Sequence, residues 1–301
     1  MLFVRDFAGF TGGHLKFADY MRHTAASGIA DPVLYQTPRS RDVSGNIFND
    51  YEGATIDELR PFPAYFLAGE DWFILEAAGI DPGGRPVVNL IQGLRHADPA
   101  HPLFAYLARP ALRICVSSAV ADAIRGHANG DVQVVENGVE LDAVVDRRPL
   151  AAPPRILIAG FKNPQVARAI SARLESHAEV DLVVEQMPRL AFLAKIAAAS
   201  ICVMLPVARE GFFLPPLEAM ALERGVVTPD CGGNRAYCRP GENCLMPDYD
   251  ADALAAAALE LAHDQRQLER LAAGGVRTAA KYSVDRERIA YQAALASYLG
   301  R

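Results

Sequence analysis

Residues 209–221 read Arg-Glu-Gly-Phe-Phe-Leu-Pro-Pro-Leu-Glu-Ala-Met-Ala. An apolar run over 201–205 comes shortly before this stretch and has the length and composition of a buried strand. The prolines at 215 and 216 predict the start of a helix, because proline suits a first helical turn. A buried strand, a loop and a helix in this order are typical of parallel α/β sheets.

Two carboxylates lie eight positions apart in this stretch. We expect Glu210 on the loop that leaves the strand and Glu218 in the first turn of the helix. The backbone N–H groups of Phe213 and Leu214 lie between them and suit a phosphate or diphosphate, because the positive end of a helix attracts anions. One acid can then hold hydroxyls of a sugar and the other those of a ribose. The stretch therefore predicts a sugar-nucleotide site in outline.

Short apolar runs alternate with helical patterns along almost the whole chain, as in sheets built from β-α-β units. In the first half, we predict strands at 2–5, 32–35, 64–68, 87–91, 114–116 and 132–135, and helices at 13–26, 71–78, 103–109 and 119–127. In the second half, we predict strands at 156–159, 182–185, 201–205, 226–228 and 244–246, followed by Ala-rich helices.

The chain has 301 residues, enough for two domains. A polar segment with prolines, 142–154, reads as a linker between them. We therefore predict an N-terminal Rossmann-like domain over 1–145 and a C-terminal Rossmann-like domain over 146–301.

Composition limits the classes of function. Half of the residues are apolar (51%) and 22% are charged, as in ordinary globular proteins. A net charge of −6 argues against non-specific binding to nucleic acid. We expect no transmembrane helix and no secretory signal, because no apolar run is long enough and the N-terminus has no basic segment. Five cysteines without Cys-x-x-Cys spacing predict a reduced, cytoplasmic protein.

The string Glu-Gly-Phe-x-Leu-Pro-x-x-Glu-Ala-Met-Ala at 210–221 resembles the signature of the retaining glycosyltransferases of family 4, the glycosyl transferases group 1. Weaker matches to the same family are Asn-Gly-Val at 137–139, Gly-Val-Val-Thr at 225–228, Gly-Gly at 232–233 and Gly-Glu-Asn-Cys-Leu at 241–245. The resemblance implies an α/β protein of the GT-B fold, in which two Rossmann-like parallel-sheet domains face each other across a cleft. It also implies that the last helix, at 284–299, crosses back to the first domain.

The resemblance also assigns roles in the C-terminal domain. Glu210 would hold the hydroxyls of the transferred sugar, and Glu218 would accept hydrogen bonds from the ribose. Lys162 follows the strand at 156–159 and would neutralise the diphosphate as it leaves. The family commonly has an arginine where this chain has Phe161, so Arg209 is the other candidate cation. Glu210 and Lys162 are thus the predicted catalytic residues.

In the N-terminal domain, the resemblance places Gly12 and Gly13 against the donor's diphosphate or sugar. Glycines at a strand-to-helix turn let a phosphate approach the backbone, although a tight turn alone also needs them. Gln92 occupies the place of the family's cleft histidine on the acceptor side. His96, four residues later, either takes over that place or is an ordinary loop histidine.

No residues have the spacing of a metal site, and the resemblance implies metal-independent transfer with no cofactor beyond the nucleoside-diphosphate sugar itself. Asp250 and Asp252 match an Asp-x-Asp pattern, but they come just before a predicted helix, and capping explains them better. No Gly-x-Ser-x-Gly or Gly-Lys-Ser/Thr motif indicates a hydrolase or an NTPase.

The predicted function is transfer of a sugar from a nucleoside-diphosphate sugar to a hydroxyl of a saccharide or glycolipid acceptor, in polysaccharide biosynthesis. We expect a cytoplasmic enzyme, with at most peripheral contact at the inner face of the membrane. Two alternatives stay open: a sugar-nucleotide epimerase of the same fold, and a catalytically weak accessory subunit that binds the nucleotide sugar.

Overall fold

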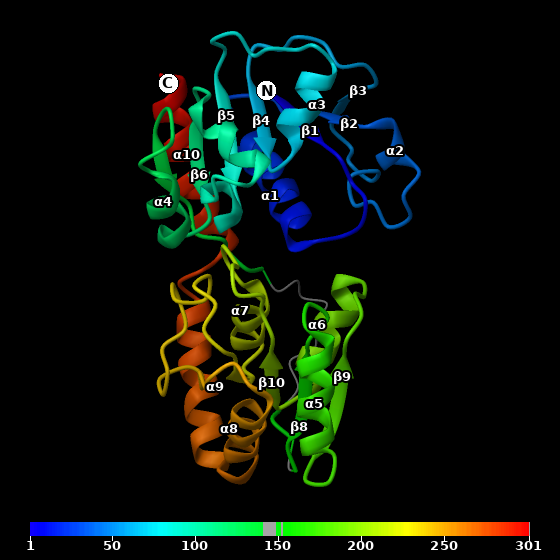
Figure 1. Ribbon diagram of the computed structural model, residues 1–301, viewed down its shortest axis with the longest axis vertical. Helices are drawn as coiled ribbons and strands as arrows, with labels where there is room; N and C mark the ends of the chain where they lie inside the picture. Colours follow the sequence, from blue (N-terminus) through cyan, green and yellow to red (C-terminus); the bar gives the residue numbers. More distant parts are fainter. Residues whose placement is uncertain (141–148, 152, 301) are drawn as a thin grey trace. The chain divides into compact units, whose positions relative to one another are not determined.

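The computed structural model describes residues 1–140, 149–151 and 153–300. They form two compact units, which Figure 1 shows in blue to blue-green with the red last helix, and in green to orange. The first unit is Met1–Asn137 together with the chain from Asp285 on, and the second unit is Gly138–Val284. The predicted boundary between 145 and 146 lies outside the described residues, as does most of the predicted linker.

The first unit is built on a parallel sheet of seven strands in the order β3-β2-β1-β4-β5-β6-β7. The strands are β1 (Leu2–Arg5), β2 (Val33–Gln36), β3 (Ala54–Ile56), β4 (Tyr65–Ala68), β5 (Val87–Ile91), β6 (Leu112–Cys115) and β7 (Val132–Val134). The helical segments are α1 (Gly12–Ser27), α2 (Pro38–Arg41), α3 (Asp71–Ala77), η1 (Leu94–Ala97), η2 (Pro102–Ala108) and α4 (Ser118–Ile124). The strand order reverses between β1 and β4, which is the Rossmann arrangement.

The central strands of this sheet are mostly apolar and buried because helices cover them. Phe3 of β1 stacks on Phe66 of β4 with ring centroids 4.4 Å apart, and Phe17 of α1 meets Phe3 edge-on at 5.5 Å. This aromatic cluster fixes α1 on the sheet, and α1 begins at the glycine turn that follows β1.

The last helix, α10 (Val284–Leu299), packs within the first unit, where Figure 1 shows it in red. Buried Tyr291 donates or accepts a hydrogen bond of 2.8 Å with Thr24 of α1. Lys16 of α1 forms buried ion pairs with Asp19 at 2.6 Å and with Glu287 of α10 at 2.5 Å. The contacts of Tyr291 with Thr24 and of Glu287 with Lys16 hold the C-terminal helix on α1.

The second unit has a parallel sheet of four strands in the order β11-β10-β8-β9. The strands are β8 (Arg155–Ala159), β9 (Glu179–Val183), β10 (Ile201–Met204) and β11 (Gly225–Val227). The helices are α5 (Pro164–Leu174), α6 (Arg189–Ala198), α7 (Leu214–Ala221), α8 (Ala251–His263) and α9 (Gln265–Ala279). One core cluster joins β8 and β10 to α5, α8 and α9. The order reverses between β8 and β10, so the loops after these two strands lie at the switch point where such sheets bind ligands.

The structure differs from the expected elements at several places. The predicted helix at 103–109 is the 3-10 helix η2, and β3 was not expected. The predicted strand at 244–246 reduces to two isolated bridges, from Cys244 to Pro240 and from Leu245 to Val227. Because α7 begins at Leu214, Glu218 lies in its second turn, so its predicted place in the first turn is wrong.

Within the part of the chain that the structure describes, no helix has both the length and the apolar character needed to cross a membrane.

Candidate functional site

The predicted catalytic residues, Lys162 and Glu210, meet at the switch point of the second sheet. Lys162 follows β8 and Glu210 follows β10, and these neighbouring parallel strands end together, with Met204 opposite Ala159. The Lys162 Nζ donates to Glu210 Oε1 at 2.5 Å. The side chain of Lys162 is 34% exposed and that of Glu210 is 14% exposed. The pair is therefore reachable by a charged ligand.

Further contacts fix the loops that carry this pair. The Val207 N–H donates to the same Glu210 Oε1 at 3.3 Å. Tyr249 Oη donates to the Pro206 carbonyl at 2.5 Å and accepts from Asn163 Nδ2 at 3.3 Å. Tyr249 thus joins the loop after β8 to the loop after β10.

Gly233 brings a third loop against Glu210. A Cβ atom at position 233 would lie 2.7 Å from the Glu210 carbonyl oxygen and 3.0 Å from the Glu210 Cβ. Only glycine allows this approach without a shift. Buried Cys231 lies on the same loop, and burial raises the pKa of its thiol to about 11, so it stays protonated near neutral pH.

The start of α7 differs in part from the expectation. The Phe213 N–H, expected to face a ligand, donates to the Gly233 carbonyl at 3.4 Å. The Phe213 carbonyl accepts from Tyr237 Oη, so the backbone of Phe213 is held within the unit. Leu214 opens the helix, where N–H groups have no partner within the helix. The Phe213 ring instead lies 5.5 Å from Lys162 Nζ, within cation–π range.

Glu218 is buried, with 3% exposure, and forms an ion pair with Arg189, the first residue of α6. This partner could not be predicted from the sequence, because 29 residues separate the two and only the fold brings α6 beside α7. Arg209, the other predicted cation, is exposed on the loop next to Glu210.

In the first unit, the predicted glycines and Gln92 also come together. The Gln92 amide donates to the Gly13 carbonyl at 3.2 Å. A Cβ on Gly13 would lie 3.0 Å from Gln92 Oε1, so a side chain there would press on this contact. Gly12 is exposed at the first position of α1, and the Thr11 hydroxyl caps the helix. These groups lie at the carboxyl ends of β1 and β5.

His96 is placed differently from Gln92. It lies in η1 with 3% exposure, and burial lowers its pKa to about 3, with help from the charge of Arg95. Among the described residues, no hydrogen bond joins His96 to Gly12 or Gly13. Its position is that of a neutral core histidine.

Asp250 caps α8, as the sequence predicted. Its Oδ1 accepts from the N–H groups of Asp252 and Ala253, each at 2.9 Å. Asp252 pairs with Arg173. The described residues contain no group of three or more His, Cys, Asp or Glu side chains that could hold a metal ion.

A comparison with protein families matches residues 139–264 to the model described as "Glycosyl transferases group 1". Residues 139–264 form a glycosyl transferases group 1 domain. This glycosyltransferase domain contains Lys162, Glu210 and the Glu218–Arg189 pair.

Solved structures resemble the chain over its whole length. HepE of Anabaena in complex with UDP-glucose has a TM-score of 0.76 at 14% identity, covering 98% of this chain and 99% of that chain. Sucrose-phosphate synthase from Thermosynechococcus elongatus has a TM-score of 0.73 at 14% identity, covering 99% of both chains. A glycosyltransferase from Rickettsia africae has a TM-score of 0.72 at 12% identity, covering 99% of this chain and 98% of that chain.

These likenesses establish the fold. The chain is an α/β protein of the GT-B class with two parallel sheets, which confirms the predicted class. A comparison with curated proteins found no match.

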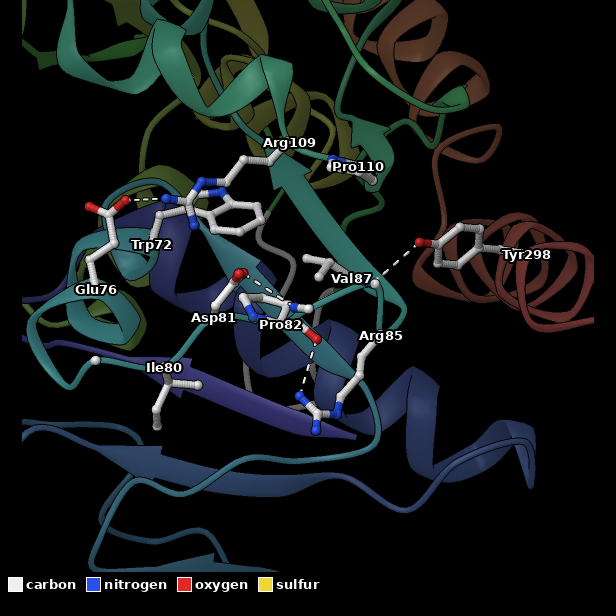
Figure 2. A pocket seen from close by; sticks show the side chains of 13 residues that line it. Trp72, Glu76, Ile80, Asp81, Pro82, Arg85, Val87, Arg109, Pro110 and Tyr298 are labelled. Atoms are coloured by element: carbon white, nitrogen blue, oxygen red, sulfur yellow. Dashed lines mark hydrogen bonds and ion pairs between the residues drawn. The ribbon is translucent and has the colours of Figure 1, made fainter.

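A cavity lies outside the glycosyltransferase domain. Figure 2 shows this pocket of about 610 Å³ in the first unit. It is lined by the loop before β5, by Pro110 before β6 and by Tyr298 of α10, whose hydroxyl accepts from the Val87 N–H at 3.2 Å. The pocket is therefore at the amino ends of the strands, whereas Gly13 and Gln92 lie at the carboxyl ends.

Proposed function

We propose that this protein is a retaining glycosyltransferase that moves a hexose from a UDP-sugar to a hydroxyl of a saccharide or lipid-linked acceptor. The observation that carries the proposal is the Lys162–Glu210 pair at the switch point of a glycosyl transferases group 1 domain. The UDP donor is supported by the likeness to HepE, whose structures hold UDP-glucose or UDP and glucose.

The chemistry asks the protein to stabilise negative charge that grows on the departing diphosphate. Lys162 is the cation at this place, and a fixed positive charge in a partly enclosed site is worth more than one in water. In the structure, Glu210 neutralises Lys162 at 2.5 Å. A bound diphosphate would take over Lys162, which frees Glu210 to accept hydrogen bonds from the sugar hydroxyls and orient the ring.

Glu218 would accept hydrogen bonds from the ribose, and the opening of α7 at Leu214 would face the phosphates. Arg209, Gly12 and Gly13 stay proposed donor contacts, with Gln92 proposed on the acceptor side. His96 is buried, so we propose no contact between its ring and the acceptor. Because the Phe213 N–H already has an acceptor, we assign it a weaker part than Leu214. We propose no metal cofactor. A cytoplasmic location and a role in polysaccharide biosynthesis remain predictions.

Glu210→Ala tests the proposal. Turnover should fall by two or more orders of magnitude, because the sugar loses the group that orients it, while the melting temperature stays within a few degrees. Turnover is followed as UDP released from UDP-sugars with a panel of saccharide acceptors. Near-normal turnover in Glu210→Ala would remove the catalytic assignment.

The accessory-subunit alternative has one specific observation in its favour. Phe161 stands where the resembled family has an arginine, and its ring lies 6.4 Å from that of Phe192. A site with one fewer cation could bind a donor and transfer slowly. Tight UDP-sugar binding without transfer or hydrolysis would favour this alternative, and isomerised donor recovered without acceptor would favour an epimerase.

A further inference from the structure

The acid predicted to meet the ribose has a partner on another helix. Glu218 lies in the second turn of α7, and Arg189 is the first residue of α6, directly after Pro188. The guanidinium Nη1 contacts Glu218 Oε1. Glu218 is 3% exposed and the Arg189 side chain is 25% exposed, so Arg189 is the member of the pair that solvent reaches.

Burial makes this contact more consequential than a surface ion pair. A carboxylate removed from water is costly unless a partner compensates its charge. The guanidinium contacts one oxygen of this carboxylate, and its planar geometry restricts the direction of that contact more than the point charge of a lysine would. The contact therefore determines where the free lone pairs of Glu218 point.

We propose that Arg189 is a positioning residue, which holds the Glu218 carboxylate in the orientation that receives the ribose hydroxyls of the nucleoside diphosphate. The inference rests on the proposed function, since it takes the ribose contact of Glu218 from there. It adds that the start of α6, which follows the carboxyl end of β9, orients the carboxylate that makes this contact.

The same helix offers a control pair, which is more exposed. Lys195 of α6 contacts both oxygens of Asp181 on β9, at 2.8 and 2.7 Å. Like the Arg189–Glu218 pair, this pair ties α6 to a neighbouring element, but its acid has no predicted contact with the donor. Lys195→Met thus removes an ion pair of α6 without touching the proposed ribose site.

The experiment measures the affinity of the full chain for UDP and for 2′,3′-dideoxyuridine diphosphate by calorimetry. The ratio of the two affinities reports the ribose hydroxyls alone. We expect the wild-type protein to prefer UDP by roughly tenfold or more, since hydrogen bonds to a charged acceptor are of that strength. Arg189→Met should reduce the preference to less than about twofold, and Lys195→Met should leave it unchanged.

The outcomes test the positioning role of Arg189 and the ribose contact of Glu218 separately. A preference that survives in Arg189→Met makes the ion pair purely structural and overturns the inference alone. A wild-type protein that binds both nucleotides equally removes the ribose role of Glu218, and one that binds neither removes the UDP donor. If Arg189→Met does not fold, Arg189→Lys is measured instead, because it keeps the positive charge and loses the planar guanidinium. A full preference for UDP in Arg189→Lys contradicts the proposal, and a reduced preference supports it.

Discussion

Replacing Gly233 with alanine should disturb the candidate site through one atom. The added Cβ would lie 2.7 Å from the Glu210 carbonyl oxygen, whereas ordinary contact begins at 3.4 Å, so one loop must move by 0.7 Å (3.4 − 2.7). The oxygen belongs to the backbone, and no flexible side chain can absorb the shift. Overpacking of this kind costs about 1–3 kcal/mol of unfolding free energy.

The larger effect should be on function. The displaced residue carries the carboxylate that contacts Lys162 at 2.5 Å. Because a misplacement of about 1 Å can reduce a rate about 100-fold, we expect Gly233→Ala to lower kcat/KM by roughly 10- to 100-fold. The assay is release of nucleoside diphosphate from the donor, together with the melting temperature.

Gly274→Ala is the matched control for this prediction. Its Cβ would lie 2.0 Å from the Glu242 carbonyl oxygen, which is a harder clash with backbone in the same unit. It should destabilise the unit at least as much, while the folded protein keeps its kcat/KM. Equal losses of activity in both variants, or activity within twofold of wild type in Gly233→Ala, would refute the reasoning.

Three further predictions concern stability. Lys16→Met removes the buried ammonium that Asp19 and Glu287 share, although Asp19 keeps its pair with Arg22. It should lower the unfolding free energy in urea by about 3–5 kcal/mol, because a buried ion pair loses one partner. A loss below about 1 kcal/mol would contradict this. Burial lowers the pKa of His96 from 6.5 to about 3. Between these two values the unfolded chain is protonated at His96 and the folded protein is not, so the unfolding free energy falls as the pH drops below 6.5. From pH 7 to pH 5, the unfolding free energy of the wild type should fall by about 2 kcal/mol more than that of His96→Gln. Asp250→Ala removes the cap of α8 and should lower the unfolding free energy, measured by thermal unfolding, by about 1 kcal/mol. The turnover of the donor should stay the same in this variant, both with and without a metal chelator.

Much of the fold followed from apolar runs, because strands buried on both faces must be continuously apolar. β1 and β5 have the predicted bounds, and the remaining predicted strands of both sheets are shifted by a few residues, apart from 244–246. β3 could not be predicted, since Ala54–Ile56 is short and largely exposed at the edge of the sheet, where no burial pattern marks it.

The candidate site could be predicted residue by residue but not contact by contact. Lys162 and Glu210 were expected at the carboxyl ends of strands, and the adjacency of β8 and β10 turns this into an ion pair. The hydrogen bond from the Phe213 N–H to the Gly233 carbonyl could not be predicted from the sequence. The start of a helix indicates which N–H groups lack an acceptor within the helix, but it does not indicate which loop provides the acceptor. Arg189 was missed for the same reason, since its partner comes from another helix.

Burial distinguishes the Lys162–Glu210 ion pair from the Arg189–Glu218 ion pair. Glu210 and Lys162 both reach solvent, so an incoming diphosphate can take over Lys162 without leaving an unpaired charge in the interior. Separating Arg189 from Glu218 would leave a carboxylate of 3% exposure uncompensated, which costs several kcal/mol. We therefore expect the donor to open the first pair and to leave the second closed. A complex with UDP in which Lys162 still holds Glu210 while Arg189 has left Glu218 would contradict this order.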